Sequence, residues 1–317
     1  MKIHSKHRKP STLQIIVGAL CLSCIYILFN AYVSAEKEEM DYLEKIDKKY
    51  NVYSFPTPTE VFFADETVPM EDMDVYERLD RELIVNTYYH SNTFLSFKRA
   101  NRWFPVIEKI LKKNGIPEDF KYLALIESSL QNSVSPAGAR GFWQFLEGTG
   151  KEFGLEINDE IDERYHVEKA TEAACRYFNK AYERLGSWSM VAGSYNMGIA
   201  GIQSEMLRQK TNSYYDLLLN EETKRYLFRL LAVKEIFENP ERYGFNVRES
   251  DLYPPLEYSI VEIDTAVADF ADFAISFGIS YKTLKYFNPW LRQGYLKNPK
   301  KKKYSIKLPL NAVRKEN

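Results

Sequence analysis

Apolar residues recur at three- and four-residue spacing from Met73 to Gly244, which places them along one face of an α-helix. Helix-breaking residues interrupt this pattern, for example at Asn114-Gly115, Ser135-Pro136 and Gly186-Ser187, and divide it into separate helices. No stretch of alternating apolar and polar residues, which would indicate a β-strand, lies between these breaks. The pattern therefore predicts a mainly α-helical domain over residues 73–245.

The pattern changes after the Tyr253-Pro254-Pro255 segment, which marks a boundary between two domains. The β-branched and aromatic residues of 256–263 and 304–308 predict two strands. Two short helical patterns, around 265–277 and 280–287, lie between them. The sequence thus predicts a small module with the order strand, helix, helix, strand over residues 250–317.

The amino-terminal region contains an almost uninterrupted apolar run from Leu13 to Val33, preceded by four basic residues and no acidic residue. About 20 apolar residues cross a bilayer as a helix, and the basic flank would stay in the cytoplasm. Val33-Ser34-Ala35 also resembles a signal-peptide cleavage site, so residues 1–35 are expected to be either a membrane anchor or a cleaved signal. Both alternatives export the protein. Pro56 and Pro58 favour an extended chain, so residues 36–72 are expected to be a linker.

Composition limits the chemistry that the exported part can perform. The 317 residues include 43 basic and 44 acidic residues, and this balance gives no overall positive field for nucleic acid. Cys21 and Cys24 lie in the apolar run, which leaves Cys175 alone and no disulfide framework. Only His90 and His166 follow the run, and neither has metal-ligand spacing around it. We therefore expect no cofactor and no metal, and a carboxylate as the catalytic group.

The candidate carboxylate is Glu127, in the segment Tyr122–Leu130. On a helix it shares one face with Leu123, Ile126 and Leu130, so it projects from the apolar side. A carboxylate in that position loses hydration, which raises its pKa and keeps it protonated as a general acid. Periodicity alone favours the alternative, a capped or ion-paired helix residue.

Three further segments supply the groups that a sugar-binding site requires. Ser135–Phe145 combines tight-turning residues with an aromatic pair and the amide of Gln144. Ser194–Gly198 ends a helix beside a sharp turn, and Glu222–Tyr226 opens another helix with Tyr226 on its inner side. Aromatic rings stack on apolar sugar faces, and amides pair with hydroxyl and acetamido groups. Their order around one apolar-face glutamate indicates a binding site for a polysaccharide.

At this point the chain resembles the lytic murein transglycosylases. Glu127-Ser128, Gly141–Gln144, Tyr195-Asn196-x-Gly198 and Glu222–Tyr226 match, in order, the four motifs of the soluble-lytic-transglycosylase domain. The resemblance covers residues 85–240 and implies a lysozyme-like helical fold. The departures are modest: Glu147 replaces the usual Pro, Ser194 replaces Ala, and Met197 replaces a small residue, which could reshape a sugar subsite.

The resemblance implies cleavage of the β-1,4 bond between N-acetylmuramic acid and N-acetylglucosamine in peptidoglycan without water, leaving a 1,6-anhydro end. Most glycosidases use two carboxylates. Here the substrate's own acetamido group would replace the second carboxylate by stabilising the developing cation. Glu127 would act as acid and then as base, and Tyr226 would orient it. Ser135, Gln144, Tyr195 and Asn196 would bind the sugars.

The sequence also allows two functions other than transglycosylation. A hydrolase of the goose-type lysozyme kind would need a second acidic group, for which Asp159, Asp162 and Glu163 are candidates. A non-catalytic scaffold that binds peptidoglycan is the other rival. The presence of both Glu127 and Tyr226 argues against a non-catalytic scaffold.

The carboxy-terminal segment 256–310 resembles a LysM module, a βααβ unit that binds chains containing N-acetylglucosamine. The supporting segments are Tyr258–Ile260, Asp264-Thr265, Phe277–Ile279, Asn288-Pro289 and Tyr304–Pro309. Ile263 stands where the usual Gly precedes Asp-Thr, so glycan affinity could be altered or lost. The expected partners are peptidoglycan glycan strands and, if the amino-terminal segment stays uncleaved, the membrane; the expected location is the periplasm.

Overall fold

The computed structural model describes residues 22–27, 29, 30, 32, 37 and 53–310, and it divides into two compact units, 1–54 and 55–317. The first unit includes the apolar run, most of which lies outside the described residues. None of the helices that the structure describes combines the length and apolar character that crossing a bilayer requires.

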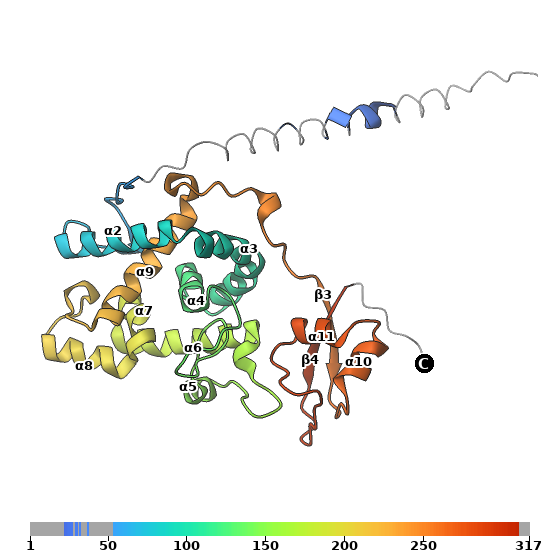
Figure 1. The fold of residues 1–317 in the computed structure, drawn as a ribbon. Helices are drawn as coiled ribbons and strands as arrows, with labels where there is room; N and C mark the ends of the chain where they lie inside the picture. The colour runs from blue at the N-terminus through green and yellow to red at the C-terminus, as the bar shows by residue number, and fades with distance from the viewer. Residues whose placement is uncertain (1–21, 28, 31, 33–36, 38–52, 311–317) are drawn as a thin grey trace, which may run out of the picture. The chain divides into compact units, whose positions relative to one another are not determined.

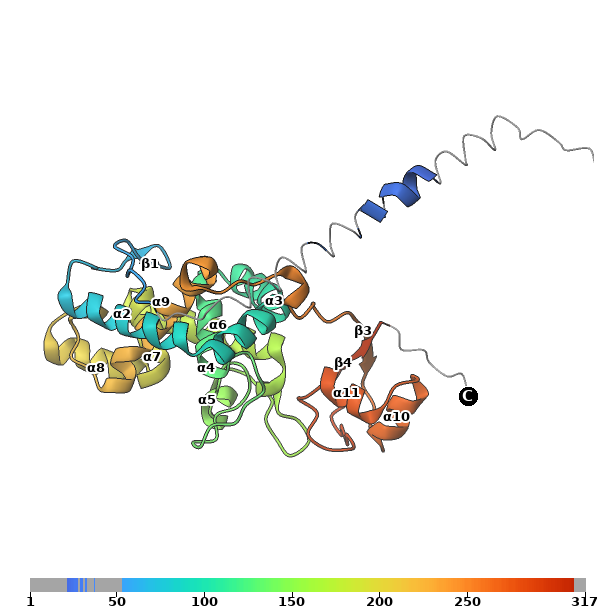
Figure 2. The ribbon, with the colours of Figure 1, turned by 45° about the horizontal axis from the view of Figure 1, so that its top comes forward.

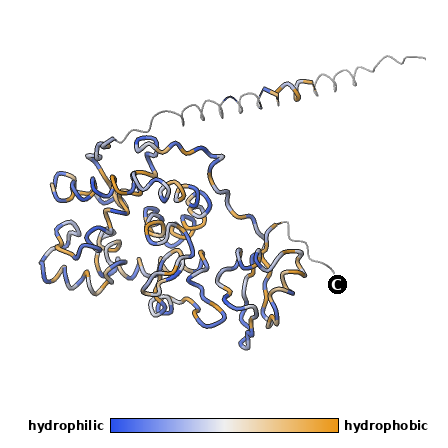
Figure 3. The backbone as a smooth tube through the Cα atoms, in the orientation of Figure 1, coloured by the Kyte–Doolittle hydropathy of each residue, from blue (hydrophilic) through white to orange (hydrophobic). Residues whose placement is uncertain are grey.

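The helical part of the second unit is built around α9 and α6, as Figures 1 and 2 show. Helix α9 packs against α2, α4 and α7, whereas α6 packs against α3, α7 and α8. Hydrophobic positions cluster along α4 at the centre of this part (Figure 3), and its side chains Leu123, Ala124 and Leu125 are buried. The helices are α2 (Met73–Tyr88), α3 (His90–Lys113), α4 (Lys121–Ser128), α5 (Glu147–Glu152), α6 (Val167–Leu185), α7 (Trp188–Met197), α8 (Ile199–Gln209) and α9 (Glu221–Glu238). The prediction of a mainly α-helical domain is confirmed.

Single-turn 3₁₀ helices join several of these elements. They are η1 (Glu118–Phe120), η2 (Glu163–Tyr165), η3 (Tyr214–Asp216), η4 (Pro240–Tyr243) and η5 (Glu249–Asp251). Of these, η2 matters most for the functional regions, because it precedes α6 and its residues Glu163, Arg164 and Tyr165 are all buried.

We expected residues 36–72 to form a linker. This prediction is wrong for residues 55–72, which fold onto the helical domain. The strands β1 (Phe62–Phe63) and β2 (Glu66–Thr67) form an antiparallel hairpin. Phe63 is fully buried, with its ring centroid 5.3 Å from that of Phe120. Glu66 accepts hydrogen bonds from the backbone N–H groups of Trp188 and Ser189, so it caps α7. Prolines favour an extended chain whether it is packed or free, so the sequence could not separate the two cases.

Helix α4 ends earlier than the expected segment 122–130. Ser129 and Leu130 adopt left-handed φ values of 49° and 54°, which no α-helix can include. Leu130 is still buried, but through the turn after the helix and not through the helix face. The turn leaves Glu127 one residue from the carboxyl end of α4.

The carboxy-terminal module has the predicted order β3 (Tyr258–Ile263), α10 (Phe270–Ser276), α11 (Tyr281–Phe287) and β4 (Tyr304–Pro309). The two strands pair antiparallel, with Tyr258 opposite Pro309 and Ile263 opposite Tyr304. The βααβ prediction is therefore confirmed. Fully buried residues of both helices and β4 form its core, namely Phe270, Ala274, Leu284 and Ile306.

The module is not a separate body, because the helical domain contributes to its core. Ile161 and Tyr165, from the segment before α6, are buried among the module's residues. Backbone hydrogen bonds cross the junction from Asp162 N to Trp290 O at 2.9 Å and from Arg292 N to Glu160 O at 2.8 Å. The junction is thus built like a domain interior, with shared apolar packing and paired backbone groups.

Candidate active site

Glu127 lies at the carboxyl end of α4, where it meets the first turns of α9. The Tyr226 hydroxyl donates a hydrogen bond to Glu127 Oε1, and Tyr226 is 2% exposed. Thr223 and Tyr226 are three residues apart on α9 and both are buried, as the expected inner face of this helix requires. The structure therefore brings together two groups that are 99 residues apart in the chain.

The surroundings of Glu127 favour its protonated form. Burial raises the pKa of Glu127, and the negative charge of Glu222 adds to this effect. The hydrogen bond from Tyr226 and the positive charge of Arg229 act in the opposite direction without cancelling it. A carboxyl group in this setting can carry a proton at a higher pH than an ordinary glutamate, as a general acid must.

Tyr226 and Tyr195 remain neutral phenols next to this carboxyl group. Burial and the charge of Glu127 raise the pKa of both hydroxyls well above the ordinary value for tyrosine. The Tyr195 hydroxyl donates to Trp143 O at 2.8 Å, and its ring packs edge-on against Phe145 and Tyr177. Tyr195 thus joins α7 to the loop that carries Trp143.

Ser128 joins helix α4 to the same loop. Its hydroxyl contacts Ala124 O at 3.2 Å, one turn earlier, and Phe142 O at 2.9 Å. Trp143 is fully buried and donates from Nε1 to Thr171 Oγ1 on α6 at 2.9 Å. These contacts fix the loop relative to Glu127 from both sides.

The loop of residues 133–145 holds Ser135 and Gln144 through its own hydrogen bonds. Gln144 has a left-handed φ of 48°, and its Nε2 donates to Gly141 O at 2.7 Å and Ser133 O at 3.2 Å. The Ser135 hydroxyl accepts from Ala139 N at 3.0 Å. Among the described residues, the hydrogen bonds of Ser135 and Gln144 stay within the loop and do not reach Glu127. Their expected contacts with sugar remain predictions.

Arg164 is a site residue that sequence reasoning missed. Its guanidinium is buried and donates to Gly138 O at 3.2 Å and Phe145 O at 3.3 Å, which closes the loop at two points. A Cβ on Gly141 would lie 1.9 Å from Arg164 O, so only glycine allows this close approach. Arg164 is a single basic residue in an acidic turn, 19 residues after Phe145, and it gives no periodic signal that would reveal this contact.

Two of the three acidic residues considered for a hydrolase, Asp162 and Glu163, are engaged in ion pairs. Asp162 pairs with Arg164 at 2.7 Å and Arg140 at 3.3 Å, and it is 2% exposed. Glu163 pairs with Lys169 and accepts from Glu156 N at 2.8 Å. Asp159 is exposed on the loop before η2. The first two carboxylates therefore serve to hold η2 in place.

Asn196 is positioned by the start of α9. Its Nδ2 donates to Glu222 Oε1 at 3.1 Å, and its Oδ1 accepts from Thr223 Oγ1 at 2.7 Å. Asn196 and Met197 are both partly exposed at the end of α7, before Gly198. The motif Glu222–Tyr226 suggests no role for Glu222 itself. In the structure, Glu222 orients Asn196.

Arg229 is the second residue that the sequence did not reveal. Its guanidinium carbon lies 5.7 Å from the centre of the Tyr226 ring, one turn along α9. Arg229 also lines a cavity of about 190 Å³ with Ile126 and Ser129, the neighbours of Glu127. Arg229 thus lies against the Tyr226 ring, and it makes no ion pair with the Glu127 carboxylate among the described residues.

Comparisons with known proteins agree with the motifs. Residues 104–218 match the profile described as "Transglycosylase SLT domain", and residues 259–312 match "Soluble lytic transglycosylase C-terminal LysM-like domain". Two relatives, both named membrane-bound lytic murein transglycosylase D, come from the K12 and O6:H1 (CFT073) strains of Escherichia coli. Each is 30% identical over 238 residues, which cover 72% of this chain and 50% of the relative. The chain thus spans about half the length of these relatives.

Among solved structures, the chain is similar to an inactive mutant of the lytic transglycosylase Slt from Pseudomonas aeruginosa. The TM-score is 0.35 at 15% identity, over 48% of this chain and 26% of that protein.

Proposed function

Because the chain belongs to the lytic murein transglycosylases, with an SLT domain and a LysM-like domain as its motifs predicted, we propose that it acts on peptidoglycan as a lytic transglycosylase. It would cleave the β-1,4 bond between N-acetylmuramic acid and N-acetylglucosamine. The product would carry a 1,6-anhydromuramic acid end, and no cofactor would take part.

Glu127 performs both proton transfers in the proposed reaction. Its protonated carboxyl group gives a proton to the oxygen of the leaving N-acetylglucosamine as the glycosidic bond breaks. The acetamido oxygen of the muramic acid stabilises the positive charge that develops at the anomeric carbon. Glu127, now a carboxylate, accepts the proton of the C6 hydroxyl while that oxygen bonds to the anomeric carbon. The carboxyl group is then protonated again, and no water is consumed.

Tyr226 positions the Glu127 carboxyl through this cycle. A neutral hydroxyl can donate to the carboxylate without neutralising it, so Glu127 remains able to take the second proton. Asn196, held by Glu222 and Thr223, would bind the sugar near the scissile bond. Ser135, Gln144 and Tyr195 would bind or shape the neighbouring sugar positions.

The observation that carries the proposal is one half-buried carboxyl group with a phenol as its hydrogen-bond partner. A hydrolase would require a second carboxylate to activate water. The acidic residues that were candidates for this role include Asp162 and Glu163, which are tied into ion pairs that hold η2. This favours an intramolecular attack over attack by water.

Mass spectrometry of products formed in H₂¹⁸O tests the proposal. Incubation of the purified chain with sacculi should release muropeptides that lack one water and contain no ¹⁸O. Muropeptides with ¹⁸O at the reducing end would establish a hydrolase instead. Absence of any released muropeptide would point to a binding scaffold.

We further propose that the protein acts in the periplasm, after export by residues 1–35 as an anchor or a cleaved signal. Residues 73–245 would form the catalytic domain and residues 250–317 the wall-binding module. Fractionation of cells that express the chain with a carboxy-terminal tag would test the location. A tag found in the cytoplasmic fraction would contradict it.

A further inference from the structure

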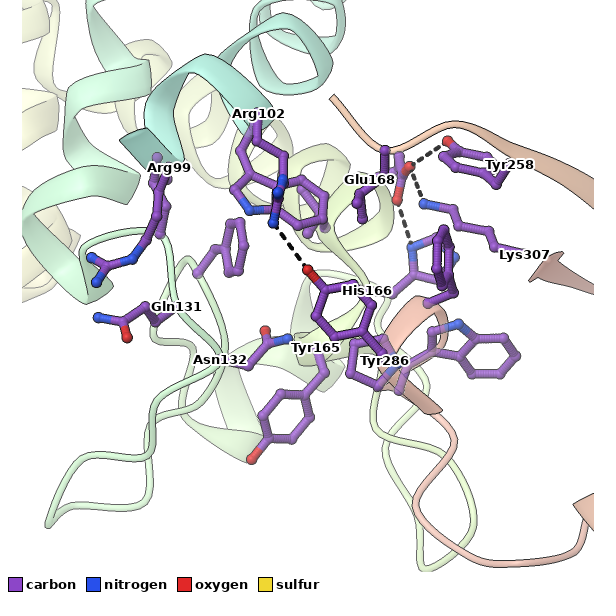
Figure 4. Close-up of a pocket in the computed structure, with 18 of the residues that line it drawn as sticks. Arg99, Arg102, Gln131, Asn132, Tyr165, His166, Glu168, Tyr258, Tyr286 and Lys307 are labelled. Carbon is purple, nitrogen blue, oxygen red and sulfur yellow. Dashed lines mark hydrogen bonds and ion pairs between the residues drawn. The ribbon is translucent and has the colours of Figure 1, made fainter. Parts of the chain in front are cut away.

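A cavity of about 420 Å³ lies where the helical domain meets the LysM-like module (Figure 4). It opens between α3, the turn that follows α4, the start of α6, and the strand and helix of the module. Aromatic and positively charged side chains are prominent in its lining, among them Arg99, Arg102, Trp103, Tyr286 and Trp290. The proposed reaction assigns no role to these residues.

Charge is distributed unevenly between the two ends of this cavity. At one end Glu168 is neutralised, because Lys307 pairs with it and His166 Nδ1 lies 3.1 Å away. Neither Arg99 nor Arg102 forms an ion pair with any described residue. Figure 4 shows Arg99 beside Gln131 at the end away from Glu168, with Arg102 and Tyr286 between the two ends. The cavity therefore has two positive charges that no described carboxylate matches.

Both guanidinium groups keep unused hydrogen-bond donors. Arg102 donates to Pro254 O and to Tyr286 OH, each at 2.9 Å, and Arg99 donates to Ser129 O at 3.1 Å. A guanidinium has five N–H groups in a fork that fits a carboxylate. Gln131 and Asn132 add two exposed amides to the same lining. A ligand with carboxylates would match these donors in both charge and geometry.

The cavity begins within a few residues of the proposed acid. Ser129, which Arg99 binds, lies two residues after Glu127, and Leu130, Gln131 and Asn132 continue into the lining. In peptidoglycan the sugars joined at the scissile bond are neutral, whereas the stem peptide on the muramic acid carries carboxylates. Resting on the proposed function, we infer that this cavity binds carboxylates of the stem peptide while the glycan occupies the site at Glu127.

The rates on two substrates would test this inference in the full-length chain. Intact sacculi carry stem peptides, whereas glycan strands stripped by an amidase do not. The ratio of kcat/KM on intact strands to that on stripped strands should fall about tenfold in Arg102→Gln, because loss of one charge-assisted contact has about this effect. The matched control Lys109→Gln removes a charge from the exposed side of the same helix and should leave the ratio unchanged.

An unchanged ratio in Arg102→Gln would overturn the inference, as would an equal fall in Lys109→Gln. A uniform loss on both substrates would assign Arg102 to the junction alone and would also overturn it. Failure of the proposed function itself looks different, because the wild type would then release no anhydro product from either substrate.

A binding experiment keeps the inference testable if Arg102→Gln disturbs the fold. Calorimetric titration of the wild-type chain with L-alanyl-D-glutamate should show binding, and the same dipeptide with both carboxylates amidated should bind about tenfold more weakly. Arg102→Lys, which keeps the charge, should retain more of this preference than Arg102→Gln. Equal affinity for the two dipeptides would rule out a carboxylate site.

Discussion

Glu127 and Glu168 show how the partner of a shielded carboxylate decides what that carboxylate can do. Burial is the largest single influence on the pKa of both groups, and in both it acts upward. Glu127 accepts a hydrogen bond from the neutral phenol of Tyr226, and its pKa stays raised. The hydrogen bond and charge of His166 and the charge of Lys307 outweigh burial at Glu168, and its pKa falls well below the ordinary value. Charge on the partner, rather than burial alone, separates an acid from a permanent anion.

The two regions use these carboxylates for opposite purposes. The proposed active site keeps a group whose charged form is unfavourable, which suits proton transfer but costs stability. The junction between the domains keeps a group whose charged form is favourable, which links α6 to β4 across two domains.

Glu127→Gln should reduce the release of anhydro-muropeptides by about a thousandfold or more, because the amide can neither give nor take the transferred proton. Release from sacculi is followed by chromatography of soluble products. The control Glu183→Gln makes the same change at an exposed position of α6 and should leave the rate within about twofold. Retained turnover in Glu127→Gln would remove Glu127 from the mechanism.

Tyr226→Phe should lower the rate by roughly ten- to a hundredfold, because the Glu127 carboxyl loses its positioning hydrogen bond. That bond lowers the pKa of Glu127, so its loss should move the alkaline limb of the pH–rate profile to higher pH. Tyr182→Phe, at an exposed tyrosine of α6, serves as the control. A shift of the limb to lower pH would contradict the assigned partner.

Glu168→Gln should destabilise the protein by about 2 kcal/mol at pH 7, because Lys307 and His166 lose a partly buried anionic partner. The folded-state pKa of Glu168 is depressed, so its contribution is present above the unfolded-state pKa of about 4.3. The difference between wild type and variant should shrink as the pH falls below that value. Urea unfolding at pH 7 and pH 3.5 measures it, and a constant difference would contradict the pairing.

Glu127→Gln should have a smaller effect of opposite sign on stability, a gain of about 1 kcal/mol at high pH. The folded-state pKa of Glu127 is raised, so the folded state prefers its protonated form. Stability is therefore lost as the pH rises from about 4.3 through the raised pKa, and the amide escapes that loss. Urea unfolding across this window measures the gain. A destabilised variant at pH 8 would show that the charged form is not penalised.

The sequence predicted those features that repeat at short intervals. Glu127 on an apolar face, Tyr226 on the inner face of α9, and the two strands of the module follow from spacings of two, three and four residues. Contacts between distant segments escaped prediction. Arg164 closes a loop 19 residues earlier, Glu66 caps a helix more than 120 residues later, and residues 55–72 pack where a linker was expected.

The packing of the LysM-like module against the helical domain also could not be predicted from the module's own residues. The sequence marked a boundary at Tyr253-Pro254-Pro255, and the chain does change fold class there. Ile161 and Tyr165 complete the module's core from the other side of that boundary. Two apolar residues in a polar loop carry no periodic signal, so only the assembled structure assigns them.

The central claim, that the two carboxylates titrate in opposite directions from an ordinary glutamate, is tested most directly by ¹³C NMR. The side-chain carboxyl carbons of Glu127 and Glu168 would be assigned by the loss of one signal in each Gln variant and followed with pH. We predict a midpoint for Glu127 above the usual glutamate value of about 4.3 and one for Glu168 below it. Midpoints that coincide, or that lie in the reverse order, would contradict the account.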